Sequence, residues 1–155
     1  MARIHGLIAV VMLFAAFLAG GYVVFRDSMV FGVIYAAVIA VFFIVIPAVY
    51  CEKCPCRDKC MHAILGPISK FIRPHPDKSY YTAMDVVLTL AIAAAAVVFP
   101  QLWLLKDIPL LIFYWAAVGL AAGEVLLFVC RGCENEKCPM KNILGKPLQN
   151  RNKPM

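Results

Sequence analysis

The sequence predicts an all-α membrane protein with four transmembrane helices, arranged as two duplicated hairpins. Two observations favour this class, namely the amount of apolar sequence and an internal repeat. Apolar residues make up 63% of the 155 positions, whereas soluble domains are closer to about half apolar. They gather into four blocks, each long enough to cross a hydrocarbon core of about 30 Å as a helix.

The four blocks form two pairs, and a short polar turn joins the members of each pair. In lipid, backbone polar groups need partners within their own segment, so we expect helices rather than open strands. The first block follows Arg3 and is similar to a signal peptide, but it exceeds the apolar region of about 7–15 residues typical of such peptides. We therefore expect it to be retained as a helix. The blocks cover residues 4–25, 30–50, 83–105 and 108–130.

The chain repeats itself at an offset of 79 residues. Cys51 maps to Cys130, Cys54 maps to Cys133, and an Ile-Leu-Gly triplet recurs after each cysteine group. The same offset aligns the first apolar block with the third. Duplication of one helical hairpin accounts for these matches, which need no gap.

We therefore divide the chain into a first repeat, residues 1–78, and a second repeat, residues 79–155. Each repeat contains two helices followed by a cysteine-rich segment. Because each repeat has an even number of spans, both enter the membrane in the same direction, as parallel repeats related by an axis along the membrane normal. We expect a pseudo-twofold four-helix bundle in which both C-x-x-C motifs lie at the same face.

The distribution of basic residues predicts the topology. Lys and Arg gather in the connection between the hairpins, residues 52–82, and in the C-terminal tail, while the short turns hold only Arg26 and Lys106. Cytoplasmic segments collect such residues, so we expect a multi-pass inner (plasma) membrane protein with both termini in the cytoplasm. The net charge of +6 then reflects topology and anionic lipid neighbours. Nucleic acid is not an expected partner, because no recognition motif accompanies the charge.

This topology places all seven cysteines on the reducing side of the membrane, where structural disulfides are rare. C-x-x-C pairs there are typical of metal ligands or working thiols. The spacing lets two thiolates hold one ion, and a tetrahedral site then needs two more ligands. Nearby Lys and Arg favour the thiolate form, since positive charge lowers the pKa of a thiol. The candidate metal ligands are Cys51, Cys54, Cys56, Cys60, Cys130, Cys133 and Cys138, with His62 as a further candidate.

Three arrangements of these ligands fit the spacing. Each repeat can hold its own iron–sulfur cluster. The four thiols of the first repeat match the number that a [4Fe–4S] centre needs, and the second repeat would add Glu134, Glu136 or a borrowed thiol. Alternatively, the two C-x-x-C motifs form one shared site, and zinc can occupy either geometry as a structural staple. Iron–sulfur is favoured because Cys51 and Cys130 lie at the bilayer boundary, where a redox centre meets quinones and soluble proteins.

Two acidic residues lie within the apolar spans. Glu124 is inside the fourth span, six residues before Cys130, and Asp85 begins the third span. Acidic groups in a span are costly and usually face the bundle interior or a water-filled cavity. Proton uptake coupled to electron transfer, or quinone binding, would use such residues. The structural alternatives are an interhelical hydrogen bond for Glu124 and helix capping by Asp85.

Together these features predict a membrane electron-transfer or anchor subunit that carries one or two iron–sulfur centres at the cytoplasmic membrane surface. Its expected partners are the lipid bilayer, a redox or membrane-complex protein, and a quinone. A zinc-stapled scaffold and a metal-free thiol–disulfide redox protein are the alternatives. A transporter is less expected, since the sequence indicates no pair of broken helices. No phosphate loop, dinucleotide-binding glycines or nucleophile triad indicates a catalytic residue.

Overall fold

The computed structural model of the protein describes residues 2–54, 65–72, 81–130 and 138. All the secondary structure in these ranges is helical, and four helices are long and apolar enough to cross a membrane, as predicted. Their ends lie within two residues of the predicted ones. The four spans are Ile4–Asp27, Met29–Cys51, Ala83–Leu104 and Ile108–Val129.

Two helical hairpins make up the fold, and a short helix lies between them in the sequence. The second long helix of each hairpin ends in a π-helical turn, and the first long helix of the second hairpin is broken into two pieces. In chain order the elements are α1 (Ala2–Asp27), α2 (Met29–Ile46), η1 (Pro47–Cys51), α3 (Leu65–Ile72), α4 (Ala83–Val98), α5 (Gln101–Leu104), α6 (Ile108–Glu124) and η3 (Val125–Val129).

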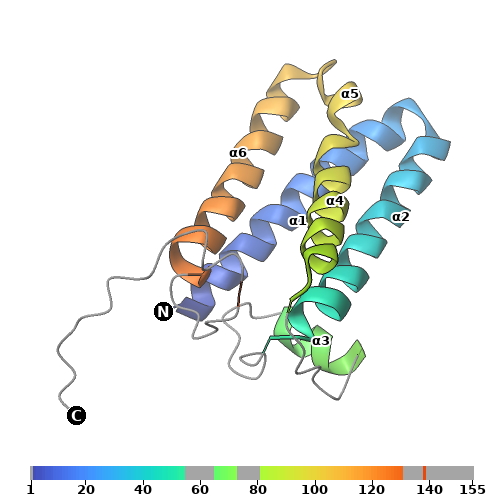
Figure 1. The fold of residues 1–155 in the computed structure, drawn as a ribbon. Helices are drawn as coiled ribbons and strands as arrows, with labels where there is room; N and C mark the ends of the chain where they lie inside the picture. The colour runs from blue at the N-terminus through green and yellow to red at the C-terminus, as the bar shows by residue number, and fades with distance from the viewer. Residues whose placement is uncertain (1, 55–64, 73–80, 131–137, 139–155) are drawn as a thin grey trace, which may run out of the picture.

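The two hairpins pack against each other in antiparallel order, with the first helix of one beside the second helix of the other. α1 packs along α6, and α2 packs against α4, so the first helix of each hairpin contacts the second helix of the other (Figure 1). A small core lies where α1, α5 and α6 meet. Many large apolar side chains outside this core face outward, which suits a bundle surrounded by lipid. The core residues are Ala16, Val23, Leu104, Tyr114 and Ala117.

Two tight turns close the hairpins at one end of the bundle, which we call the turn end. Ser28 has an extended backbone, with φ −155° and ψ 122°, and it separates α1 from α2. A Cβ atom on Gly32 would lie 2.4 Å from the ring of Phe25, so the close approach of the two helices requires glycine there. In the second turn, Asp107 caps α6 by accepting a hydrogen bond from the backbone N–H of Leu110.

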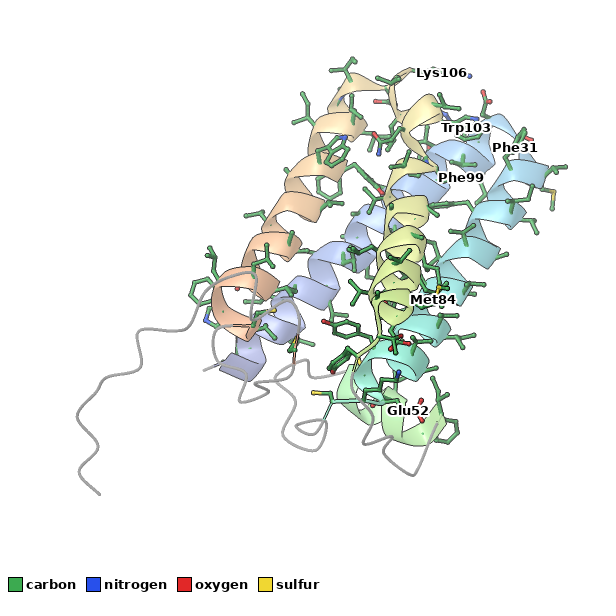
Figure 2. All side chains as sticks on the ribbon, viewed as in Figure 1. Phe31, Glu52, Met84, Phe99, Trp103 and Lys106 are labelled. Atoms are coloured by element: carbon green, nitrogen blue, oxygen red, sulfur yellow. The ribbon has the colours of Figure 1, made fainter. Side chains whose placement is uncertain are left out.

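Polar contacts between the two turns join the hairpins to each other. Lys106 Nζ lies 3.1 Å from Asp27 Oδ1, and Arg26 lies 3.7 Å from Asp107, so each turn gives one cation and one carboxylate to the other. Trp103 Nε1 also donates a hydrogen bond to Asp27 at 2.9 Å. Figure 2 shows Trp103 and Lys106 at this end of the bundle. These contacts fix the turn end of one hairpin relative to the other.

A layer of aromatic rings lies next to these turns, between α2 and the broken third span. Phe31 and Trp103 have ring centroids 5.3 Å apart, and Trp103 and Phe99 have centroids 5.6 Å apart (Figure 2). Tyr35 stacks on Phe99 at 5.6 Å. Phe31 and Trp103 are therefore part of a packed aromatic layer between helices.

The third span is interrupted, whereas its apolar sequence predicts one continuous helix. α4 ends at Val98 and α5 begins at Gln101, because Pro100 has no N–H to continue the helical ladder. The carbonyl of Ala96, four residues before the proline, therefore loses its usual donor. The hydroxyl of Tyr35 on α2 donates to this carbonyl at 3.3 Å.

A second carbonyl at the break is satisfied in the same way. The hydroxyl of Tyr114 on α6 donates to Val97 O at 3.1 Å, and Gln101 Nε2 donates to the same oxygen at 2.8 Å. On α1, a Cβ atom at Gly20 would lie 3.1 Å from the Tyr35 hydroxyl. All four long helices therefore meet at this break. Tyr35 replaces the donor that the proline removes, and Tyr114 supplies a donor to the neighbouring carbonyl.

Candidate functional site

The end of the bundle opposite the turns, which we call the cysteine end, is formed by η1, η3, α3 and the first turns of α1 and α4 (Figure 1). η1 ends at Cys51, and η3 ends at Val129, next to Cys130. Pro47 begins η1 and interrupts its α-helical hydrogen bonding, while no proline accounts for η3. π-helical turns occur frequently at functional sites. Both C-x-x-C motifs therefore begin at the same end of the bundle.

The structure describes four of the candidate cysteine ligands. Cys51, Cys54, Cys130 and Cys138 are each partly buried. The backbone N–H of Cys54 donates to Cys51 O at 3.1 Å, so the first C-x-x-C motif forms a tight turn. Among the described residues, no three His, Cys, Asp or Glu side chains lie close enough together to hold a metal ion. The remaining candidates, Cys56, Cys60, Cys133 and His62, lie outside the described residues.

A contact between the two halves of the chain brings Cys138 to the end of the first hairpin. The hydroxyl of Tyr50 and the Sγ atom of Cys138 are 3.3 Å apart. Tyr50 immediately precedes Cys51, and its ring packs on Tyr81 at a centroid distance of 4.8 Å. The last cysteine of the second group thus contacts the side chain of the residue that precedes the first C-x-x-C motif. The sequence gives no signal for this pairing, because Cys138 belongs to a segment without helical periodicity.

Lys53, inside the first C-x-x-C motif, is tied to the start of α4. Its Nζ atom lies 2.6 Å from Asp85 Oδ2, and the two side chains are only 14% and 15% exposed. Asp85 also accepts from the backbone N–H of Thr82 at 2.8 Å, while Thr82 Oγ1 accepts from the backbone N–H of Asp85. This reciprocal capping box contains the capping contact expected for Asp85. The ion pair with Lys53 was not predicted, and it positions the motif against α4.

Glu52 is the other residue between Cys51 and Cys54, and it lies near α3 (Figure 2). Glu52 is 7% exposed and lies beside α3 in Figure 2. α3 packs against η1 with Ser69 fully buried, while Phe71 on the same helix is exposed. α3 is therefore an amphipathic helix packed against η1. The residues that the 79-residue offset aligns with α3 lie outside the described residues.

Glu124 pairs with a histidine from the start of the first span. His5 Nδ1 and Glu124 Oε2 are 2.7 Å apart, with the two side chains 31% and 24% exposed. The His5 ring stacks on Phe128 with centroids 4.2 Å apart and planes inclined by 5°. This is the interhelical hydrogen bond considered as the structural alternative for Glu124. His5 was not predicted as its partner, although the two residues are ionisable groups on otherwise apolar helices.

No protein-family model, curated protein sequence or solved structure matches this chain. Its chemistry is therefore read from its own side chains. Thiols of both halves, a partly buried Lys–Asp pair and a His–Glu pair gather at one end of a bundle of apolar helices. Thiols are the ligands that thiophilic metals prefer, and imidazole and carboxyl groups can exchange protons.

Proposed function

We propose that this protein is an integral membrane electron-transfer or anchor subunit that carries an iron–sulfur centre on thiolates from both halves of the chain. The contact between Tyr50 and Cys138 at 3.3 Å carries the proposal. It brings a cysteine of the second group into contact with Tyr50, the residue before the first C-x-x-C motif, which supports a centre with thiolates from both halves. A cubane cluster needs four such ligands.

The proposed shared centre depends on duplication of the hairpin. In this proposal a pseudo-twofold axis along the membrane normal relates the two repeats. Three observations support it: the alternate helix packing, the reciprocal contacts of Asp27 and Asp107 with basic residues, and the π-helical turns before both motifs. An axis of this kind places Cys51 and Cys130 at the same depth on either side of the bundle centre.

The proposed orientation follows from the positive-inside rule. The basic connection between the hairpins leaves the bundle at the cysteine end, so this end faces the cytoplasm of a plasma membrane. There the centre lies between a soluble redox partner and lipid-soluble carriers in the bilayer. Lys53 is paired with Asp85 at 2.6 Å, and its role is to hold the motif in place.

Anaerobic purification in detergent tests the metal assignment. We expect a coloured protein with broad visible absorption that bleaches on reduction, and with iron and acid-labile sulfide in equal amounts. Cys51→Ser and Cys130→Ser should each lose most of the iron, because each removes a thiolate next to a span. Ser28→Ala, at the turn end, is the control and should keep it. A colourless, iron-free protein would overturn the proposal, and bound zinc in its place would identify the scaffold alternative.

Three further cysteine variants separate the ligand arrangements. If each repeat holds its own cluster, Cys56→Ser and Cys60→Ser should reduce iron content by about half. If the two C-x-x-C motifs alone form the site, then Cys56→Ser, Cys60→Ser and Cys138→Ser should all leave iron unchanged. We expect Cys138→Ser to lower the iron content, because its sulfur contacts Tyr50, the residue before the first motif. An iron content in Cys138→Ser equal to that of the wild-type protein would exclude a centre that uses Cys138 together with the first motif.

A further inference from the structure

We propose that the pair formed by His5 and Glu124 binds the headgroup of a lipid-soluble quinone and exchanges protons with it. This inference rests on the proposed electron-transfer function, because it names the partner on the bilayer side of the metal centre. It assigns His5 and Phe128 to the site and excludes Asp85 from it.

The pair has the chemistry that a quinone headgroup needs. His5 Nδ1 faces Glu124 at 2.7 Å, so the other ring nitrogen, Nε2, lies on the opposite edge of the imidazole. A neutral histidine whose proton is on Nε2 can donate to a quinone carbonyl. Glu124 then carries the exchangeable proton, and the ring of Phe128, parallel to the imidazole at 4.2 Å, provides a flat apolar surface at the same place.

The pair is reached from the lipid and not from the centre of the bundle. His5 and Glu124 are each about a quarter to a third exposed, and the residues around them on α1 and η3 are exposed and apolar. Ionisable groups at such a position are costly in a bilayer, which argues for a functional use. The neighbouring exposed residues are Ile4, Ile8, Leu127 and Phe128.

The location also suits electron transfer. Glu124 is six residues before Cys130, which is about 9 Å along a helix. A headgroup held there is close to the proposed metal centre and still within the apolar span. Asp85, the other acidic residue considered, is engaged by Lys53 and by the N-terminus of α4, so its carboxylate is committed to structure.

The proposed reaction balances with two electrons and two protons. The electrons leave the iron–sulfur centre one at a time, and a soluble one-electron carrier protein reduces the centre again after each step. The two protons form the O–H bonds of the hydroquinone as its two C=O groups become C–OH. His5 gives its Nε2 proton to the quinone oxygen as Glu124 passes a proton to Nδ1 of the same ring, and Glu124 then takes up a proton from water at the cysteine end.

Binding of decylubiquinone, a short-tailed benzoquinone, tests the site in full-length protein reconstituted into nanodiscs. Calorimetry should give saturable binding to the wild-type protein, and His5→Leu and Phe128→Leu should each weaken it about tenfold. The control is Phe14→Leu, which makes the same Phe→Leu change at an exposed position of α1 and should bind decylubiquinone like the wild-type protein. Glu124→Gln should retain iron and bind within threefold of wild type, but reduce decylubiquinone at least a hundredfold more slowly, because an amide cannot carry the proton.

The same measurements separate this inference from the metal assignment. Binding is repeated in Cys130→Ser, where the proposed centre is lost and binding through His5 should persist. Wild-type protein that is iron-free but binds decylubiquinone through His5 would overturn the electron-transfer proposal alone. If the protein has its full iron content but His5→Leu and Phe128→Leu leave its affinity for decylubiquinone unchanged, the quinone site alone would be overturned. A photoreactive azidobenzoquinone should label peptides containing His5 or Phe128, and labelling confined to other helices would also overturn it.

Discussion

At the scale of single residues, Tyr50 links the two halves of the chain by one hydrogen bond to Cys138. Hydrogen bonds to ligand sulfur atoms are among the main determinants of the reduction potential of an iron–sulfur centre, and such partners of a ligand also fix its orientation. Tyr50 lies directly before Cys51, and its ring is held by Tyr81. Its hydroxyl is therefore well placed to orient the Cys138 thiol.

We predict that Tyr50→Phe leaves the fold intact but frees Cys138. Loss of one hydrogen bond of about 0.5–1.5 kcal/mol should make the Cys138 thiol react several-fold faster with a maleimide in metal-free protein. Mass spectrometry of the Cys138 peptide provides the measurement, with the other cysteine peptides as internal references. Tyr22→Phe removes an exposed hydroxyl elsewhere and should have no effect. Unchanged Cys138 reactivity in Tyr50→Phe would show that the contact does not restrain the thiol.

At the scale of elements, the break at Pro100 explains why two buried tyrosines occur in apolar helices. Ala96 O has no N–H donor at position 100, and Tyr35 replaces it. Val97 O accepts from both Tyr114 and Gln101, so it keeps a donor if either one is lost. The two tyrosines, which share equivalent positions in the two repeats, therefore differ in importance.

We predict that Tyr35→Phe destabilises the protein by about 1–2 kcal/mol and Tyr114→Phe by about half as much, in the range measured for hydrogen bonds in membranes. Unfolding in mixed detergent micelles measures both. Pro100→Ala restores an N–H at position 100, so the cost of Tyr35→Phe should shrink in that background. The cost of Tyr114→Phe should not shrink. Equal costs for Tyr35→Phe with and without Pro100 would mean that the missing N–H does not explain the contact.

The span boundaries could be predicted because they depend on length and hydropathy alone, and each agrees with the structure to within two residues. The side-chain contacts at the cysteine end could not be predicted from the sequence. A helix that is apolar on all sides carries no amphipathic stripe to show which face turns inward, so the pairing of His5 with Glu124 depends on helix rotation. The proline break was visible as Pro100, but its consequence depended on where Tyr35 and Tyr114 lie on other helices.

At the scale of the whole molecule, the bundle has two chemically different ends. The turn end is closed by short-range contacts between its two turns, with Asp27 and Asp107 each facing a basic residue of the other hairpin. All seven cysteines of the sequence lie at or after the end of the second span or the fourth, and the four that the structure describes lie at the cysteine end. A thiol placed at the turn end therefore reports on the opposite side of the membrane from the native ones.

We predict that a membrane-impermeant maleimide added to intact cells labels Ser28→Cys but not the wild-type protein. Ser28 lies in the first turn, between α1 and α2, and the positive-inside rule assigns that turn to the outside. The wild-type cysteines should become reactive only after the cells are permeabilised and the metal is removed by a chelator. Labelling of wild type in intact cells, with Ser28→Cys giving no additional signal, would reverse the topology. The cysteine end would then face an oxidising compartment, where thiolate-held iron–sulfur centres are difficult to maintain and disulfides are favoured.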